Sequence, residues 1–235
     1  MKTVLFNIRQ YVAGLDLSGS YNMHALVVDA EAKDDTAFGD LTRRYLGGLK
    51  GSGSEHEGFW ESPVDADLYD NIGAAARVAT LTLDDTDGQT AYFFDTFGTK
   101  YSPGGNVGDM HAFSASNQIT GVVTRGLVMA TGSKTGDGNG TARQLGAVAS
   151  GVKTRAALHV LDIQGGAPTL DVTVESDDAE AFTDPTTRLT FTQATAVGGE
   201  LVTADGPITD DWWRVTWDLG AGTTSALFVV SAGIA

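Results

Sequence analysis

The sequence NMHALVVDAEAKD at residues 22–34 predicts a β-strand, because its side chains alternate with a period of two. Neither face of this strand is purely apolar, which predicts a strand covered on both sides. A second strand is expected at 52–61. The residues between the two, 36–50, are rich in glycine and predict a long irregular loop. A connection of this length exceeds an ordinary hairpin turn, and loops that long are often functional.

One helix is expected after these strands, at about 63–76. Ser62 can cap it, Pro63 suits the first helical position, and Asp65 and Asp67 lie in its positive first turn. Apolar residues recur at helical spacing and form one stripe: Val64, Leu68, Ile72, Ala75 and Ala76. From Arg77 the period returns to two, and the acidic turn 84–88 predicts a hairpin.

The rest of the chain predicts further short strands separated by turns, at 109–116, 118–131, 154–163, 168–175, 186–195, 211–218 and 224–231. The predicted fold class is therefore mainly β, a β-sandwich or partial barrel with one flanking α-helix. The glycine-rich segment 134–141 is the expected domain boundary. It separates a β domain at 1–135 from residues 141–235, which either continue the sandwich or form a second one.

Composition narrows the class of function. The chain has 235 residues and a formal net charge of -15. It has no cysteine, which excludes disulfides, thiolate chemistry and zinc–sulfur sites. So acidic a chain is unsuited to gripping nucleic acid, because phosphate binding needs clustered Lys and Arg. The apolar run within Met1–Arg9 is too short for a signal peptide, and no later segment predicts a membrane span. Synthesis and use in a cytoplasm are expected.

Several patterns could carry chemistry, but each has a simpler explanation. In a strand, Glu55 and Glu57 share one face and His56 points to the other, so the three cannot converge on a metal. The two glutamates must face water, at a solvated surface or a lumen. The calcium-like segments 85–88 and 137–141 lack the downstream glutamate of a calcium loop and predict ordinary turns. No metal, cofactor or catalytic residue is predicted.

Histidines and tryptophans are expected to serve packing. His24, His111 and His159 lie in strand patterns without a nucleophile motif, which favours packed or interfacial side chains over general bases. Alternation places Trp213, Val215 and Trp217 on one strand face, predicted to be core. On the other face, Trp212 over Arg214 would form a cation–π pair.

The order of these elements resembles that of the major tail tube proteins of long-tailed bacteriophages and related tailed viruses. The resemblance covers about residues 20–130: the strand 22–34, the loop 36–50, the strand 52–61 with Gly58-Phe59-Trp60, the helix and the hairpin around 84–88. It implies a structural virion protein without enzyme activity or cofactor. Such a subunit would self-assemble into stacked, hexameric rings of a viral tail tube, contact other tail proteins and let DNA pass without specific binding. It would be assembled in the host cytoplasm.

The resemblance also assigns residues to two expected surfaces. The paired strands would line the lumen, with the candidate lumen-facing residues Glu55, Glu57, Asp29 and Glu31. The long loop would reach the neighbouring ring, with the candidate inter-ring residues Phe38, Arg43, Arg44, Tyr45 and Leu46. An acidic wall suits this role because it repels DNA and keeps its passage fast.

Two other classes of function stay open at this point. One is another viral structural β-sandwich protein, for head decoration, tail completion or the baseplate. The other is a carbohydrate-binding β-sandwich that uses Trp212, Trp213 or Tyr101 as a stacking platform. An enzyme is the least favoured reading.

Overall fold

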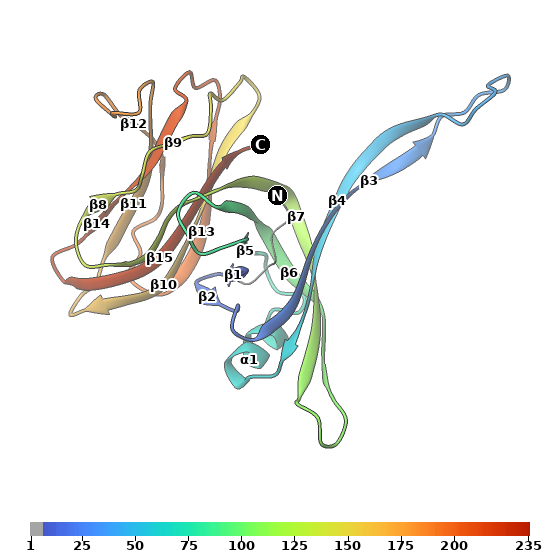
Figure 1. Ribbon diagram of the computed structural model, residues 1–235, viewed down its shortest axis with the longest axis horizontal. Helices are drawn as coiled ribbons and strands as arrows, with labels where there is room; N and C mark the ends of the chain where they lie inside the picture. Colours follow the sequence, from blue (N-terminus) through green and yellow to red (C-terminus); the bar gives the residue numbers. More distant parts are fainter. Residues whose placement is uncertain (1–6) are drawn as a thin grey trace. The chain divides into compact units, whose positions relative to one another are not determined.

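The computed structural model describes residues 7–235. Met1–Phe6, on which part of the signal-peptide prediction rests, lies outside these residues. The described chain is mainly β, with two antiparallel sheets and one short helix (Figure 1). The predicted fold class, mainly β with one flanking helix, is therefore confirmed.

Contacts group the chain into two compact units that differ from the expected division at 134–141. Unit 1 comprises residues 1–19, 76–95 and 124–235, and unit 2 comprises residues 20–75 and 96–123. The expected boundary segment lies inside unit 1. The units interleave in sequence because two long strands, β6 (Thr90–Gly104) and β7 (Ala112–Lys134), each contribute residues to both.

Unit 1 is a β-sandwich. Its larger sheet has the order β13-β10-β15-β7-β6-β5-β1-β2, and its smaller sheet has the order β12-β11-β14-β8, with β9 also on β14. Besides parts of β6 and β7, unit 1 contains the strands β1 (Arg9–Val12), β2 (Leu15–Asp16), β5 (Arg77–Thr82), β8 (Gly138–Asn139), β9 (Arg143–Gln144), β10 (Lys153–Gly165), β11 (Leu170–Asp177), β12 (Thr186–Thr190), β13 (Gly198–Asp205), β14 (Trp212–Leu219) and β15 (Thr223–Ile234).

The core of the sandwich lies between these two sheets. Trp213 and Val215 of β14 are fully buried in it, and Trp217 packs at its margin, as alternation predicted. The predicted pair of Trp212 with Arg214 is wrong. The Arg214 guanidinium lies over the ring of Phe182, 4.3 Å from its centroid, and pairs with Glu175 at 2.9 Å, because both groups flank the same side of β14 and β11.

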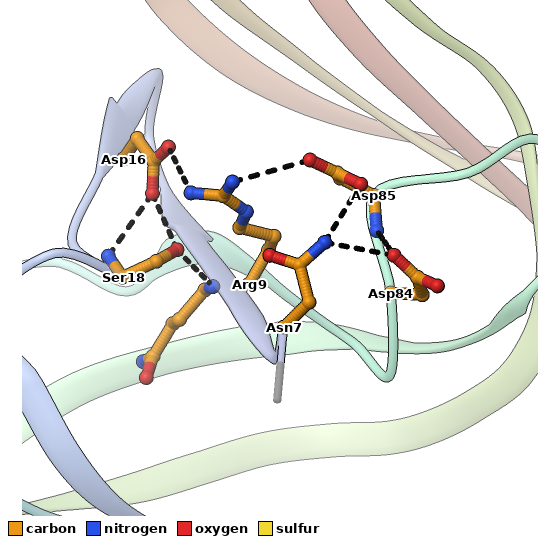
Figure 2. A network of polar contacts seen from close by, with 7 residues as sticks. Asn7, Arg9, Asp16, Ser18, Asp84 and Asp85 are labelled. Atoms are coloured by element: carbon orange, nitrogen blue, oxygen red, sulfur yellow. Dashed lines mark hydrogen bonds and ion pairs between the residues drawn. The ribbon is translucent and has the colours of Figure 1, made fainter. Parts of the chain in front are cut away.

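The acidic turn between β5 and β6 is held by donors from Asn7 and from Arg9 of β1 (Figure 2). The Asn7 amide donates to both Asp84 and Asp85 at 2.8 Å, and Arg9 pairs with Asp85 at 3.1 Å and with Asp16 at 3.7 Å. The carboxylates of Asp84 and Asp85, at the start of the calcium-like segment 85–88, are thus hydrogen-bonded or paired to side chains of the protein itself. The segment is the hairpin turn that the sequence predicts, and Gly88 supplies its positive φ of 88°.

Unit 2 is a four-stranded sheet in the order β3-β4-β7-β6, with the helix α1 (Ser62–Asp70). Its first two strands are β3 (Tyr21–Asp34) and β4 (Tyr45–Phe59). β4 is therefore longer than the predicted strand 52–61, and the connection before it is shorter than the predicted loop 36–50.

The helix ends earlier than the predicted residue 76. Val64 and Leu68 are buried as expected, but Glu61 rather than Ser62 is the N-cap. After Asp70 the backbone turns at Gly73, with a φ of 67°, and donates from Gly73 N to Gly98 O of β6 at 2.9 Å. Hydrogen bonding of this segment to β6 thus takes the place of the last helical turn that the sequence predicted before residue 76. Within residues 7–235, any helix is too short or too polar to cross a lipid bilayer.

Candidate assembly surface

The outer halves of β3 and β4 form a two-stranded ribbon without a third strand. The two strands pair from Tyr21 with Gly58 to Asp34 with Tyr45, whereas β7 pairs with β4 only from Gly53 to Phe59. Figure 1 shows this ribbon extending away from the rest of unit 2. An isolated two-stranded ribbon is marginally stable in water. The ribbon is therefore a surface suited to a partner.

Large apolar side chains are exposed along this ribbon. Val27 and Val28 of β3 and Leu46 and Leu49 of β4 are about half exposed or more. Tyr45 and Leu46, which the sequence assigned to the loop, are in fact the first residues of β4, paired with Asp34 and Lys33. Val27 and Val28 point to opposite faces of the ribbon, so exposed apolar groups lie on both faces, as expected of a strand pair that another chain covers.

The connection between the strands, residues 35–44, holds the other three candidate inter-ring residues. Phe38 is fully exposed, as is Leu41 three residues later. The connection is closed at its base, where Asp35 N donates to Arg44 O at 2.9 Å and Arg44 N donates to Thr36 Oγ1 at 3.0 Å. Its tip thus presents apolar groups and arginine on a closed turn.

β3 has an open edge along its whole length, since among residues 7–235 it pairs with β4 alone. Phe59 N donates to Ser20 O at 2.9 Å, so odd-numbered residues in this part of β4 direct their backbone groups toward β3. Val27, opposite Gly53, therefore belongs to a hydrogen-bonded pair. The alternate residues Leu26 and Val28 direct their N–H and C=O groups to the open edge.

The four candidate lumen-facing residues share one face of the unit 2 sheet. Cross-strand partners share a face, and Glu57, Glu55 and Gly51 lie opposite Met23, Ala25 and Asp29. Glu31 follows Asp29 at i+2 on β3, with Lys33 paired to it. β7 adds the uncharged Ser114, Ser116 and Gln118 to this face. Glu55 and Glu57 are exposed, as the alternation argument requires.

The opposite face carries a histidine pair, with His56 buried and His24 half-buried. Nδ1 of His24 lies 2.8 Å from Nδ1 of His56, and the Asn117 amide donates to Nε2 of His56 at 2.9 Å. Tyr21 stacks on His56 with the ring planes 9° apart. Burial lowers the pKa of His24 to about 4, and burial with the neighbouring His24 lowers that of His56 to about 3. Sequence reasoning placed His56 on this face but missed its contact with His24.

The remaining sequence candidates for chemistry do not gather into a site. His159 is fully buried and bonded to Thr80, as a packed histidine, and exposed His111 stacks on Trp60. Trp213 is fully buried and so is closed to a sugar ring, while Tyr101 donates its hydroxyl to Asp65 at 2.5 Å. In the described part of the chain, no three His, Cys, Asp or Glu side chains are grouped to hold a metal ion.

Comparison with known proteins finds solved structures that are similar to part of this chain. No protein-family model matches the chain, and no curated protein matches it in sequence. Among solved structures, a chain from the PVC sheath–tube complex of an extracellular contractile injection system in its extended state is 10% identical, with a TM-score of 0.44 over 54% of this chain and 93% of that chain. A chain of the SPP1 tail tube is 16% identical, with a TM-score of 0.38 over 49% of this chain and 74% of that chain.

A chain from the virion of a native gene transfer agent particle is 13% identical, with a TM-score of 0.40 over 48% of this chain and 94% of that chain. The chain is thus similar, over about half of its length, to single chains taken from a sheath–tube complex, a tail tube and a virion.

Proposed function

We propose that this chain is a structural subunit of a viral tail, which self-assembles into stacked, hexameric rings and forms a tube through which DNA passes. The observation that carries the proposal is the open β3 edge on a ribbon with exposed apolar side chains. An unpaired edge of this length is a liability in a monomer, because it invites pairing with another chain. In a ring subunit it becomes the assembly interface.

Ring closure needs a second edge on the same subunit, and β6 supplies it. Gly98 N donates to Asn71 O at 3.1 Å and its carbonyl accepts from Gly73, so the backbone groups of Gly98 point away from β7. Alternation gives Lys100 and Ser102 the same outward direction. Pairing of β3 in one copy with this part of β6 in the next is a heterologous contact, which generates a ring when the rotation closes.

The shared acidic face suits the wall of the channel. Asp29, Glu55 and Glu57 would face the lumen with Glu31, whose charge is offset by Lys33. DNA is polyanionic, so it would not adhere to such a wall. The role needs no cofactor and no enzyme chemistry. Other tail proteins would contact the terminal rings, and the finished tube would be part of a virion assembled in the host cytoplasm.

The substitution Val28→Pro tests ring formation, because it removes an N–H that points to the open edge and leaves the β3–β4 pairs in place. Proline is tolerated on edge strands, so the variant should fold. We expect circular dichroism like that of the wild type, with no rings or tubes by negative-stain electron microscopy. Val28→Ala keeps the N–H and is the matched control, which should assemble. Normal rings from Val28→Pro would refute pairing through this edge.

A further inference from the structure

The two ends of unit 2 carry opposite charge. Residues 33–50, at the end of the ribbon, have four basic and three acidic side chains, whereas residues 61–76, around α1, have four acidic side chains and no basic one. The acids at the ribbon end are engaged locally: Asp34 accepts from Thr36 N, Asp40 accepts from Ala37 N, and Asp35 pairs with Arg44. Arg43 of this exposed turn donates to the hydroxyl of Tyr45 at 3.4 Å.

The helix end lacks the cation that its dipole favours. The carboxyl end of a helix is negative and is stabilised by Lys, Arg or His, yet the last turn of α1 contains no basic residue and ends in Asp70. Asp70 is exposed, and so is Tyr69 before it. A basic group from another molecule would complete this end of the helix.

A hollow of about 540 Å³ lies beside the same end of α1. Tyr69, Ile72 and Tyr101 give it apolar walls, together with Thr99 and Lys100. Its floor is fixed, since the Tyr101 hydroxyl donates to Asp65 of the helix at 2.5 Å. The hollow can therefore take apolar side chains without rearrangement of α1 and β6.

The ribbon has the length and direction to bridge two copies. Its 14-residue strand β3 spans about 45 Å at the usual rise per residue, and Figure 1 shows its tip at the end of unit 2 remote from α1. A contact between opposite ends of identical units is heterologous, and it produces a filament when the rotation between copies does not close. The partner that fits both ends is therefore a second copy of this chain.

We propose that Phe38 and Leu41 of one copy dock in the hollow beside α1 of a copy in the next ring, with Arg43 and Arg44 against Asp70. This inference rests on the proposed function and names the surface that receives the ribbon tip. It concerns stacking along the tube axis, whereas the β3 and β6 edges form each ring. Lys100 borders both surfaces. The two contacts can still be broken separately, because Phe38, Leu41 and Asp70 lie outside the β3 and β6 edges.

Cross-linking tests the contact directly, because the chain has no cysteine of its own. The double variant Leu41→Cys with Ile72→Cys should give a ladder of disulfide-linked oligomers on a non-reducing gel after mild oxidation of assembled material. The matched control pairs Leu41→Cys with Val197→Cys, an exposed apolar position of unit 1, and should stay monomeric on the gel. Equal ladders, or none from the first pair, would overturn the proposal.

Two further variants separate stacking from ring formation. Phe38→Ser with Leu41→Ser should leave single rings and reduce tube length at least tenfold, since both side chains are fully exposed in the subunit and the fold does not depend on them. Arg43→Glu with Arg44→Glu should also shorten tubes, and adding Asp70→Arg should restore them. Full-length tubes from the first variant, or no restoration by Asp70→Arg, would contradict this docking. Loss of the rings themselves would instead count against the proposed function.

Discussion

His24 and His56 are held as neutral imidazoles by the geometry around them. Nδ2 of Asn117 has hydrogens to donate and no lone pair to accept with, so Nε2 of His56 accepts from it. Nδ1 of His56 then carries the proton that it donates to Nδ1 of His24. No nitrogen of His56 is then free to take a second proton. Protonation at either ring would break this chain of bonds and place a charge in a buried site, which agrees with the lowered pKa of both groups.

Acid should therefore weaken unit 2. An unfolded histidine takes up a proton near pH 6.5, but the folded pair resists until about pH 4 and about 3. The stability that this provides is full above pH 6.5 and falls as the pH drops toward 4. Between pH 7 and pH 5 the loss is about 2 kcal/mol per histidine. Urea titrations of His24→Gln with His56→Gln should show a smaller loss over this interval than the wild type.

The control for that experiment is His111→Gln, which removes an exposed imidazole and keeps the histidine pair. An unchanged pH dependence in the double variant would show that the pair does not govern acid stability. The sequence predicted the opposed directions of Glu55 and His56, because a period of two fixes them. It could not predict the contact with His24, because that depends on the register of β3 against β4, where irregularities occur after Tyr21 and after Ala30.

The β3–β4 ribbon shows why element limits were harder to predict than element order. Gly47, Gly48 and Gly51 indicate a loop by composition, yet they lie in β4. The register shift between Ala30 and Ala32 falls opposite Gly48 and Leu49, which lie between their partners Lys50 and Gly47. Glycine in a strand is typical of such a bulge. The helix limit was missed for a related reason: the residues after Asp70 have helical spacing, but their backbone pairs with Gly98.

The tip of the ribbon gives a prediction about access. Arg43 and Arg44 lie in an exposed connection, and the backbone bonds of this connection are the pair at its base and one from Asp40 N to Ala37 O, at 3.1 Å. Trypsin should cut there in the free subunit and spare the site in assembled tubes, where the proposed contact covers it. The fragments are measured by mass spectrometry. Arg43→Gln with Arg44→Gln, which should resist cleavage at this site, identifies the cut, and equal cleavage in subunit and tube would argue against a buried tip.

Each of the two compact units is built from segments that are separate in the sequence. A boundary at 134–141 is what local composition indicates, since this segment is rich in glycine and polar residues. The units are instead joined through β6 and β7, whose residues are divided between them. The division into units depends on strand pairing between segments far apart in the sequence, which local composition does not reveal. Fold class and the acidic strand face were nevertheless predictable, because both follow from local alternation.

The acidic face provides the last prediction, which concerns the assembled tube. Glu55 and Glu57 are exposed on one strand face, so Glu55→Lys with Glu57→Lys should fold, since exposed charges contribute little to stability. If this face lines the channel, tubes of the variant should retain DNA, and the retention should weaken as salt rises, because each lysine adds a phosphate contact. Co-sedimentation of DNA with tubes across a salt series measures this retention.

Asp171→Lys with Asp218→Lys is the matched control. These two exposed acids are cross-strand partners in unit 1, and their substitution changes the net charge by the same amount. Equal retention by both variants would make the effect one of net charge, and no gain in the first would place Glu55 and Glu57 away from the channel.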